Sequence, residues 1–221
     1  MNVLLAVLWK DLVSEWRSRD RLIAMLVFSL LVVLVFHFAL PGGATPRNAQ
    51  HAPGLLWIAF VFSALLGLGR AFQIELENDA LAILALAPAD RGWVFLGKAL
   101  ANLVILSLVQ AVVASVFAIV FELPILAVAA PLAGVVLLGS LGLCAVGTFF
   151  SAMSVRTRFS EMMLPVLVIP PLVPVLSAAV SATAELLRGG EVTFSSVQLL
   201  VVADLIYWIV GFVLFEYVLD E

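Results

Sequence analysis

The sequence predicts an all-α integral membrane protein with six transmembrane helices, and composition and segment length carry that prediction. Hydrophobic residues make up 64% of the 221 residues and charged residues 12%, with a mean hydropathy of +1.21. Soluble domains carry far more charge and less apolar surface. Six apolar stretches approach the roughly 20 residues that a spanning helix needs. They lie near residues 22–40, 54–72, 98–121, 124–150, 163–184 and 198–219, and leave the chain 1–221 as one transmembrane domain.

The positive charges predict the orientation. Nine of the eleven Lys and Arg residues fall on one side of the six stretches, and only Arg47 and Arg188 fall on the other. The nine are Lys10, Arg17, Arg19, Arg21, Arg70, Arg91, Lys98, Arg156 and Arg158. Because cytoplasmic flanks carry the excess of Lys and Arg, we expect a multi-pass membrane protein with both termini in the cytoplasm.

Residues 1–21 have the pattern of an amphipathic helix. Apolar residues recur at helical spacing along one face, and Lys10, Ser14, Arg17 and Arg21 share the opposite face. The apolar face consists of Leu5, Leu8, Trp9, Leu12 and Trp16. The pattern favours an interfacial elbow helix whose cations face lipid headgroups, and the alternative is a plain cytoplasmic tail.

The connection at residues 72–90 combines acidic and apolar side chains on the cytoplasmic side. Glu75 and Asp79 are four residues apart and would project together from a helix. Apolar surface beside carboxylates favours docking to another protein. The alternative is folding back on the lipid surface, which acidity disfavours because anionic headgroups would repel the segment.

The start of the third stretch resembles a phosphate-binding loop only superficially. Gly92, Gly97 and Lys98 have the right spacing, but Ala99 replaces the hydroxyl residue that would ligate magnesium. We therefore expect no nucleotide binding at this position. For the chain as a whole we expect no catalytic activity, no cofactor or metal of its own and no nucleic-acid binding.

Small residues concentrate in the fourth stretch and predict close helix packing. Ser140 and Cys144, and likewise Gly147 and Ser151, are four residues apart, with Gly139 beside them. Small side chains let helix backbones approach each other in lipid. The pattern leaves open whether the neighbouring helix belongs to this chain or to a second copy.

Four prolines interrupt the fifth stretch, at Pro165, Pro170, Pro171 and Pro174. Each proline removes a backbone donor and crowds the preceding turn. Two interpretations remain open: a kinked element that lines a path or flexes, and a structural helix that is merely bent.

Three polar residues in or near the apolar stretches are further candidates. Asp204 is expected about one and a half turns into the sixth stretch, where a snorkelling or protonated acid near the interface is the favoured interpretation and a polar path the alternative. His37 and His51 lie near the outer side and could ligate haem iron, although lone histidines are weak indicators.

Two segments resemble one known family, that of cytochrome c maturation protein B (CcmB), the membrane subunit of a haem exporter. The first is APGLLWIAFVFSALLGLGRAFQIELENDALAILALAP, from Ala52 to Pro88, and the second is LPVLVIPPLVP, from Leu164. Chain length and the layout of six spans agree with the family as well.

The resemblance implies a fold of the ABC-2 export type, with an elbow helix, six spans and a coupling helix that docks to an ATPase subunit. Asp79 and Ala82 depart from the residues expected in the family, glycine and an acid respectively. The coupling residues it implies are Phe72, Glu75, Leu76, Glu77, Leu81 and Leu84, to which the spacing argument adds Asp79.

The resemblance also implies a location in the bacterial inner membrane, partners and a function. These partners are a CcmA-like ATPase that binds ATP, CcmC-like and CcmD-like membrane proteins, and a CcmE-like periplasmic haem chaperone. Two copies of the chain are expected per complex. ATP hydrolysis would then drive either haem export, with haem as substrate, or release of the haem-loaded chaperone, which we favour. A standalone channel or secondary transporter is the alternative.

Overall fold

The computed structural model is entirely helical in the residues it describes, which are 3–40, 50–77, 91–123, 125–155 and 160–220. The side chains of 74–77, 126, 160–161 and 219–220 are not described. Within these residues, six helices are long and apolar enough to cross a membrane. The predicted all-α membrane fold is therefore confirmed.

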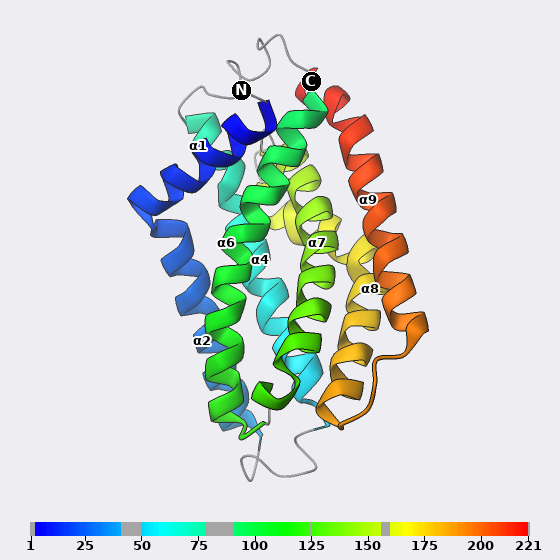
Figure 1. The fold of residues 1–221 in the computed structure, drawn as a ribbon. Helices are drawn as coiled ribbons and strands as arrows, with labels where there is room; N and C mark the ends of the chain where they lie inside the picture. Colours follow the sequence, from blue (N-terminus) through cyan, green and yellow to red (C-terminus); the bar gives the residue numbers. More distant parts are fainter. Residues whose placement is uncertain (1–2, 41–49, 78–90, 124, 156–159, 221) are drawn as a thin grey trace.

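The helices follow one another as an elbow and six spans. They are α1 (Val3–Ser18), α2 (Asp20–Ala39), α4 (Ala52–Glu77), α6 (Arg91–Val120), the 3-10 helix η1 (Ile125–Val128), α7 (Ala129–Ser154), α8 (Ser160–Leu187) and α9 (Phe194–Asp220). Figure 1 shows α1 running across one end of the bundle, with both chain termini at that same end.

The elbow helix α1 presents two tryptophans outward. Trp9 and Trp16 are each 70% exposed, whereas Val7 is buried against α6. An amphipathic helix at a membrane interface would place its aromatic rings in this way. A turn at Arg19, whose φ is 57°, then redirects the chain into α2.

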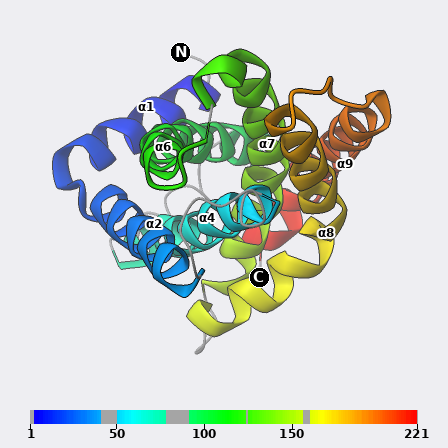
Figure 2. The same cartoon turned by 90° about the horizontal axis from the view of Figure 1, so that it is seen from below.

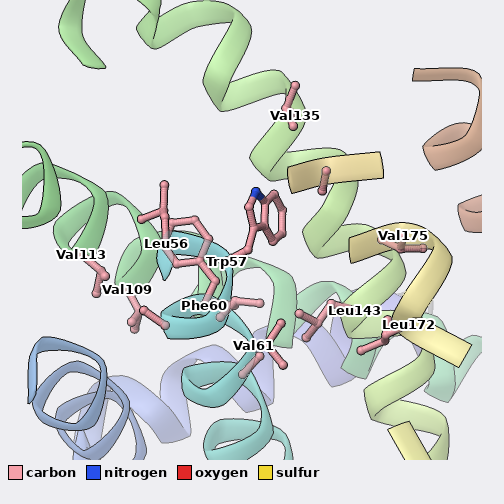
Figure 3. Packing of buried hydrophobic residues seen from close by; sticks show 14 of the residues in the cluster. Leu56, Trp57, Phe60, Val61, Val109, Val113, Val135, Leu143, Leu172 and Val175 are labelled. Atoms are coloured by element: carbon pink, nitrogen blue, oxygen red, sulfur yellow. The ribbon is translucent and has the colours of Figure 1, made fainter. Parts of the chain in front are cut away.

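The core lies where α4 and α7 pack among the other spans. Figure 3 shows the rings of Trp57 and Phe60, from α4, facing apolar side chains of α6, α7 and α8. Trp57 Nε1 donates a hydrogen bond to Thr183 Oγ1 at 3.0 Å, which ties α4 to α8 and satisfies a buried donor.

The small face of α7 packs within this chain. A side chain at Gly139 would collide with Trp57, and one at Gly147 would collide with Leu68, both of α4. Ser140 donates to Gln110 of α6 at 2.9 Å, and Ser151 donates to the carbonyl oxygen of Leu68 at 2.6 Å. Cys144 is fully buried in the same core.

The helix α8 keeps all four prolines inside one helix. Its buried face is formed by Leu164, Val168, Leu172 and Val175, while Pro170 and Pro174 are exposed. Figure 2 shows α8 changing direction along its length. Tyr207 of α9 donates a hydrogen bond to the carbonyl oxygen of Pro171, which adds a contact between α9 and the proline-rich part of α8.

Candidate functional site

Among the described residues, a cluster of buried and partly buried polar side chains joins the elbow helix to three spans. We call it the elbow network, and it consists of Asp11, Glu15, Arg21, Lys98, Asn102 and Thr148. These residues come from α1, α2, α6 and α7, at the end of the bundle that holds both termini.

Arg21 is the centre of the network. Its Nε donates to Glu15 Oε2 at 2.8 Å and its Nη1 donates to Asn102 Oδ1 at 3.0 Å. Asn102 Nδ2 in turn donates to Thr148 Oγ1 at 3.0 Å. Paired charges with further hydrogen bonds are the arrangement in which burial of ions is tolerated.

Glu15 also forms the local junction between the elbow and the first span. Its Oε1 accepts the backbone N–H of Leu22 at 2.9 Å, one of the first-turn donors of α2 that have no partner within the helix. The left-handed backbone at Arg19 makes this possible, because it turns α2 back beneath the side chain of Glu15.

Lys98 links the elbow to the end of α4. Its Nζ donates to Asp11 Oδ2 at 3.2 Å and lies 4.6 Å from the centroid of the Phe72 ring. The Phe72 ring also lies 6.4 Å from the Phe215 ring of α9, measured between centroids. Lys98 therefore contacts both the elbow helix and the end of α4, where the predicted coupling segment begins.

The structure differs from the sequence-based expectation at two basic residues. Arg21 was expected to face lipid headgroups but is only 6% exposed, because the turn at Arg19 points it into the bundle. Lys98 was expected at the flank of the third span but is 2% exposed, because α6 begins seven residues earlier, at Arg91.

Asp204 is also placed differently. With α9 starting at Phe194, Asp204 lies roughly 15 Å along the helix, near the middle of a hydrocarbon core about 30 Å thick. It is 6% exposed, and a side chain at Gly142 would meet its Oδ1. Neither carboxyl oxygen has a hydrogen-bond partner among the described residues, which fits a protonated acid better than a snorkelling one and leaves the polar path as the alternative.

The two histidines lie at the ends of α2 and α4 that face away from the elbow network. The His37 ring is in edge contact with Phe38 and Phe121, at centroid distances of 5.5 and 6.1 Å, and its buried Nδ1 has no hydrogen-bond partner in the described part of the chain. His51 is exposed immediately before α4. Within the described ranges, no group of three or more potential metal ligands occurs.

The predicted coupling residues are only partly visible. α4 continues as a helix to Glu77, beyond the predicted end of the second span. The side chains of Glu75, Leu76 and Glu77 are not described, and Asp79, Leu81 and Leu84 lie outside the described residues. Phe72 is 1% exposed, and its ring contacts Lys98 and Phe215 of this chain.

Sequence reasoning missed Asn102, Thr148 and Gln110. An amide or hydroxyl side chain within a long apolar stretch is the signal that would have identified them, since buried polar groups in a membrane require partners. Their partners could not be read from the sequence because they lie 30–81 residues away.

Comparison with known proteins places the chain in a family. The family described as "CcmB protein" matches residues 2–215. Proteins named "Heme exporter protein B" are 33% identical over 192 residues in Rhodobacter capsulatus and 33% over 188 residues in Paracoccus denitrificans. These alignments cover 84% of this chain, and 82% and 84% of the relatives.

A relative of the same name, from Bradyrhizobium diazoefficiens, is 25% identical over 211 residues, which cover 96% of this chain and 94% of the relative. The family match extends from the elbow helix into α9 and includes every residue of the elbow network. The chain is therefore a multi-pass membrane protein of the CcmB family.

Proposed function

We propose that this chain is the membrane subunit of an ATP-driven haem export system for cytochrome c maturation, and that it has no catalytic activity of its own. The similarity to relatives named "Heme exporter protein B" supports a role in a haem export system. The observation that supports coupling is the position of Lys98, which contacts both the elbow and the end of α4.

In this proposal a CcmA-like ATPase binds the segment 72–90 from the cytoplasm. Movement of that segment displaces the end of α4, where Phe72 lies against Lys98 and Phe215. Lys98 and Asp11 pass the displacement to α1, and Phe215 passes it to α9. Two copies of the chain would move together on two ATPase subunits, with CcmC-like and CcmD-like proteins beside them.

The output that we favour is release of a haem-loaded CcmE-like chaperone, not passage of haem through this chain. The placement of the two histidines supports this choice. The His37 ring contacts Phe38 and Phe121, and His51 is exposed at the start of α4. Replacing both histidines by alanine should leave the yield of holocytochrome c unchanged, and a strong loss would favour haem ligation by this chain.

The coupling proposal is tested with variants that separate docking of the ATPase from transmission of its movement to the spans. Leu84→Asp and Glu75→Lys should reduce co-purification with the ATPase, because both alter the proposed docking segment. Lys98→Met should leave co-purification intact but lower the stimulation of ATP hydrolysis several-fold, because it removes the internal link. Arg17→Gln is the control, since Arg17 is an exposed cation on the same helix as Asp11.

Normal association and normal ATP turnover in all three variants would remove the proposal. Loss of association in Lys98→Met would show instead that Lys98 supports the docking surface itself. Reconstitution into liposomes with the ATPase makes both quantities measurable on the same preparation.

A further inference from the structure

A groove of about 350 Å³ lies on the outside of the bundle between α2, α4 and α8. Figure 2 shows α4 lying between the other two helices. Phe28 of α2 and Phe62 of α4 are partly exposed there, with ring centroids 6.2 Å apart. The remaining lining residues are Leu65, Leu66, Gly69, Arg70, Gln73, Leu164 and Pro165.

The groove follows α4 from the middle of its span toward the end that holds both chain termini. Phe62, Leu66, Gly69 and Gln73 are spaced three or four residues apart and therefore share one helix face. Eleven residues separate Phe62 from Gln73, a rise of roughly 16 Å. That length is close to the depth of one leaflet, half of a hydrocarbon core about 30 Å thick.

Among the described lining residues, the interfacial end of the groove is polar and holds one cation, Arg70. Arg70 and Gln73 lie in the last turns of the apolar part of α4, which ends at Gln73. Arg70 is exposed, and among the described residues it has no ion pair and no side-chain hydrogen bond. A guanidinium at this depth can bind phosphate through two parallel N–H donors.

We propose that this groove binds an anionic phospholipid of the leaflet on the side of the chain termini. Its phosphate would lie on Arg70 and Gln73, and an acyl chain would lie along Leu66 and Phe62 toward the middle of the membrane. Charge complementarity supports this occupant, since basic pockets between spans at the cytoplasmic face recognise anionic headgroups. Because the groove lies on the outside of the bundle, lipid would reach it by lateral diffusion in the bilayer.

The bound lipid would lie between the end of α4, which belongs to the proposed mechanism, and the start of α8. Arg70 lies two residues before Phe72, whose ring contacts Lys98. Leu164 and Pro165 form the wall contributed by α8, the helix with four internal prolines. The lipid would therefore fill the space between the end of α4 and the start of α8, independently of whether haem passes through the chain.

The experiment measures lipid binding to delipidated protein in detergent by native mass spectrometry. Dioleoylphosphatidylglycerol is titrated against dioleoylphosphatidylcholine, which has the same acyl chains and no net charge. The wild type should bind the anionic lipid more tightly. Arg70→Gln should weaken that binding roughly fivefold, as expected for one interfacial arginine. Arg70→Lys should weaken it less.

A second variant tests the apolar part of the groove while leaving the charge in place. A Cβ at Gly69 would meet Leu164 Cδ2 at an ordinary contact distance of 3.5 Å, so Gly69→Leu extends into the groove without a clash at its first atom. It should lower the binding of phosphatidylglycerol although Arg70 remains. Arg188→Gln is the matched control, because Arg188 follows α8 at the opposite end.

Equal affinity of the wild type for the two lipids, or equal losses in the Arg70 and Arg188 variants, would overturn the proposal. A parallel titration with haemin distinguishes the other amphipathic anion. If Arg70→Gln weakens haemin binding and leaves phosphatidylglycerol binding unchanged, the groove recognises haem carboxylates and the lipid assignment is wrong. Thermal unfolding of each variant identifies losses of lipid binding that are caused by misfolding. If an Arg70 variant misfolds, the lipid binding of Gly69→Leu decides whether the proposal holds.

Discussion

At the scale of single residues, the buried charges of the elbow network impose the strictest requirement on the chain. Arg21, Glu15 and Asn102 satisfy one another at distances of 2.8–3.0 Å in a part of the bundle that excludes solvent. The loss of one member leaves the others buried without compensation, which costs more than the pair itself contributes.

The first prediction concerns the loss of Arg21 from its buried pair with Glu15. Arg21→Met should destabilise the protein by roughly 3 kcal/mol, because the Glu15 carboxylate stays buried without its partner. Glu15→Gln combined with Arg21→Met should be less destabilising than Arg21→Met alone, since no unpaired charge remains. Detergent-solubilised variants are compared by thermal unfolding, with exposed Arg17→Met as the control. Additive losses in the double variant would contradict the prediction.

Asp204 gives the second prediction. A carboxylate at mid-span costs roughly 2.5–3.5 kcal/mol on insertion scales, and no described residue offsets this by a hydrogen bond. Asp204→Asn should therefore keep or raise the unfolding temperature, because the amide has similar shape and no charge to desolvate.

The functional readout for the same variant is the yield of holocytochrome c. Normal yield together with unchanged stability means that Asp204 is only tolerated where it lies. A loss of yield with unchanged stability would show that the acid itself acts in export. A large drop in stability would contradict the prediction, because it would require a partner for the carboxylate.

Arg21 and Lys98 show how much of the fold could be predicted from the sequence. Arg21 and Lys98 were expected to lie at the membrane surface because both flank apolar stretches. Their burial depends on the left-handed turn at Arg19 and on the early start of α6, and on partners that become neighbours only in the fold. Number, order and approximate position of the spans depend on local hydrophobicity and were predictable for that reason.

At the scale of elements, α7 packs against four other spans, α4, α6, α8 and α9. Its glycines at positions 139 and 147 let Trp57 and Leu68 of α4 approach closely, as small residues do in membrane helices. The sequence indicated that this face packs closely but not against which helix, because small residues identify a close approach and not the neighbour. The same limit applied to α8, whose prolines predicted irregularity without fixing which face is buried.

The third prediction compares glycines along α7. Gly139→Leu and Gly147→Leu should each destabilise the protein by about 1–3 kcal/mol, because the new side chains collide with Trp57 and Leu68. Gly134→Leu is the matched control on the same helix, since nothing lies within 4 Å of a Cβ at that position. Thermal unfolding of the three variants in one detergent provides the comparison. Equal behaviour of Gly134→Leu and Gly147→Leu would show that α4 and α7 do not pack as described.

At the scale of the whole molecule, the six spans and the elbow place all described Lys and Arg residues except Arg188 toward one end. Cytoplasmic flanks of membrane proteins are enriched in Lys and Arg, so this end is proposed to face the cytoplasm. The assignment determines where an ATPase could dock and which leaflet the lipid groove contacts. It can be measured directly because the chain contains a single cysteine, the buried Cys144.

The fourth prediction uses that cysteine. In a Cys144→Ala background, single cysteines are introduced at Arg17, at Glu216 and at Arg188, all at described positions outside the core. A membrane-impermeant maleimide added to intact spheroplasts should label Arg188→Cys and neither of the others. Permeabilisation should make Arg17→Cys and Glu216→Cys reactive, since both are exposed at the end that holds the termini. Labelling of Glu216→Cys before permeabilisation would invert the topology, and with it the proposed side of ATPase docking.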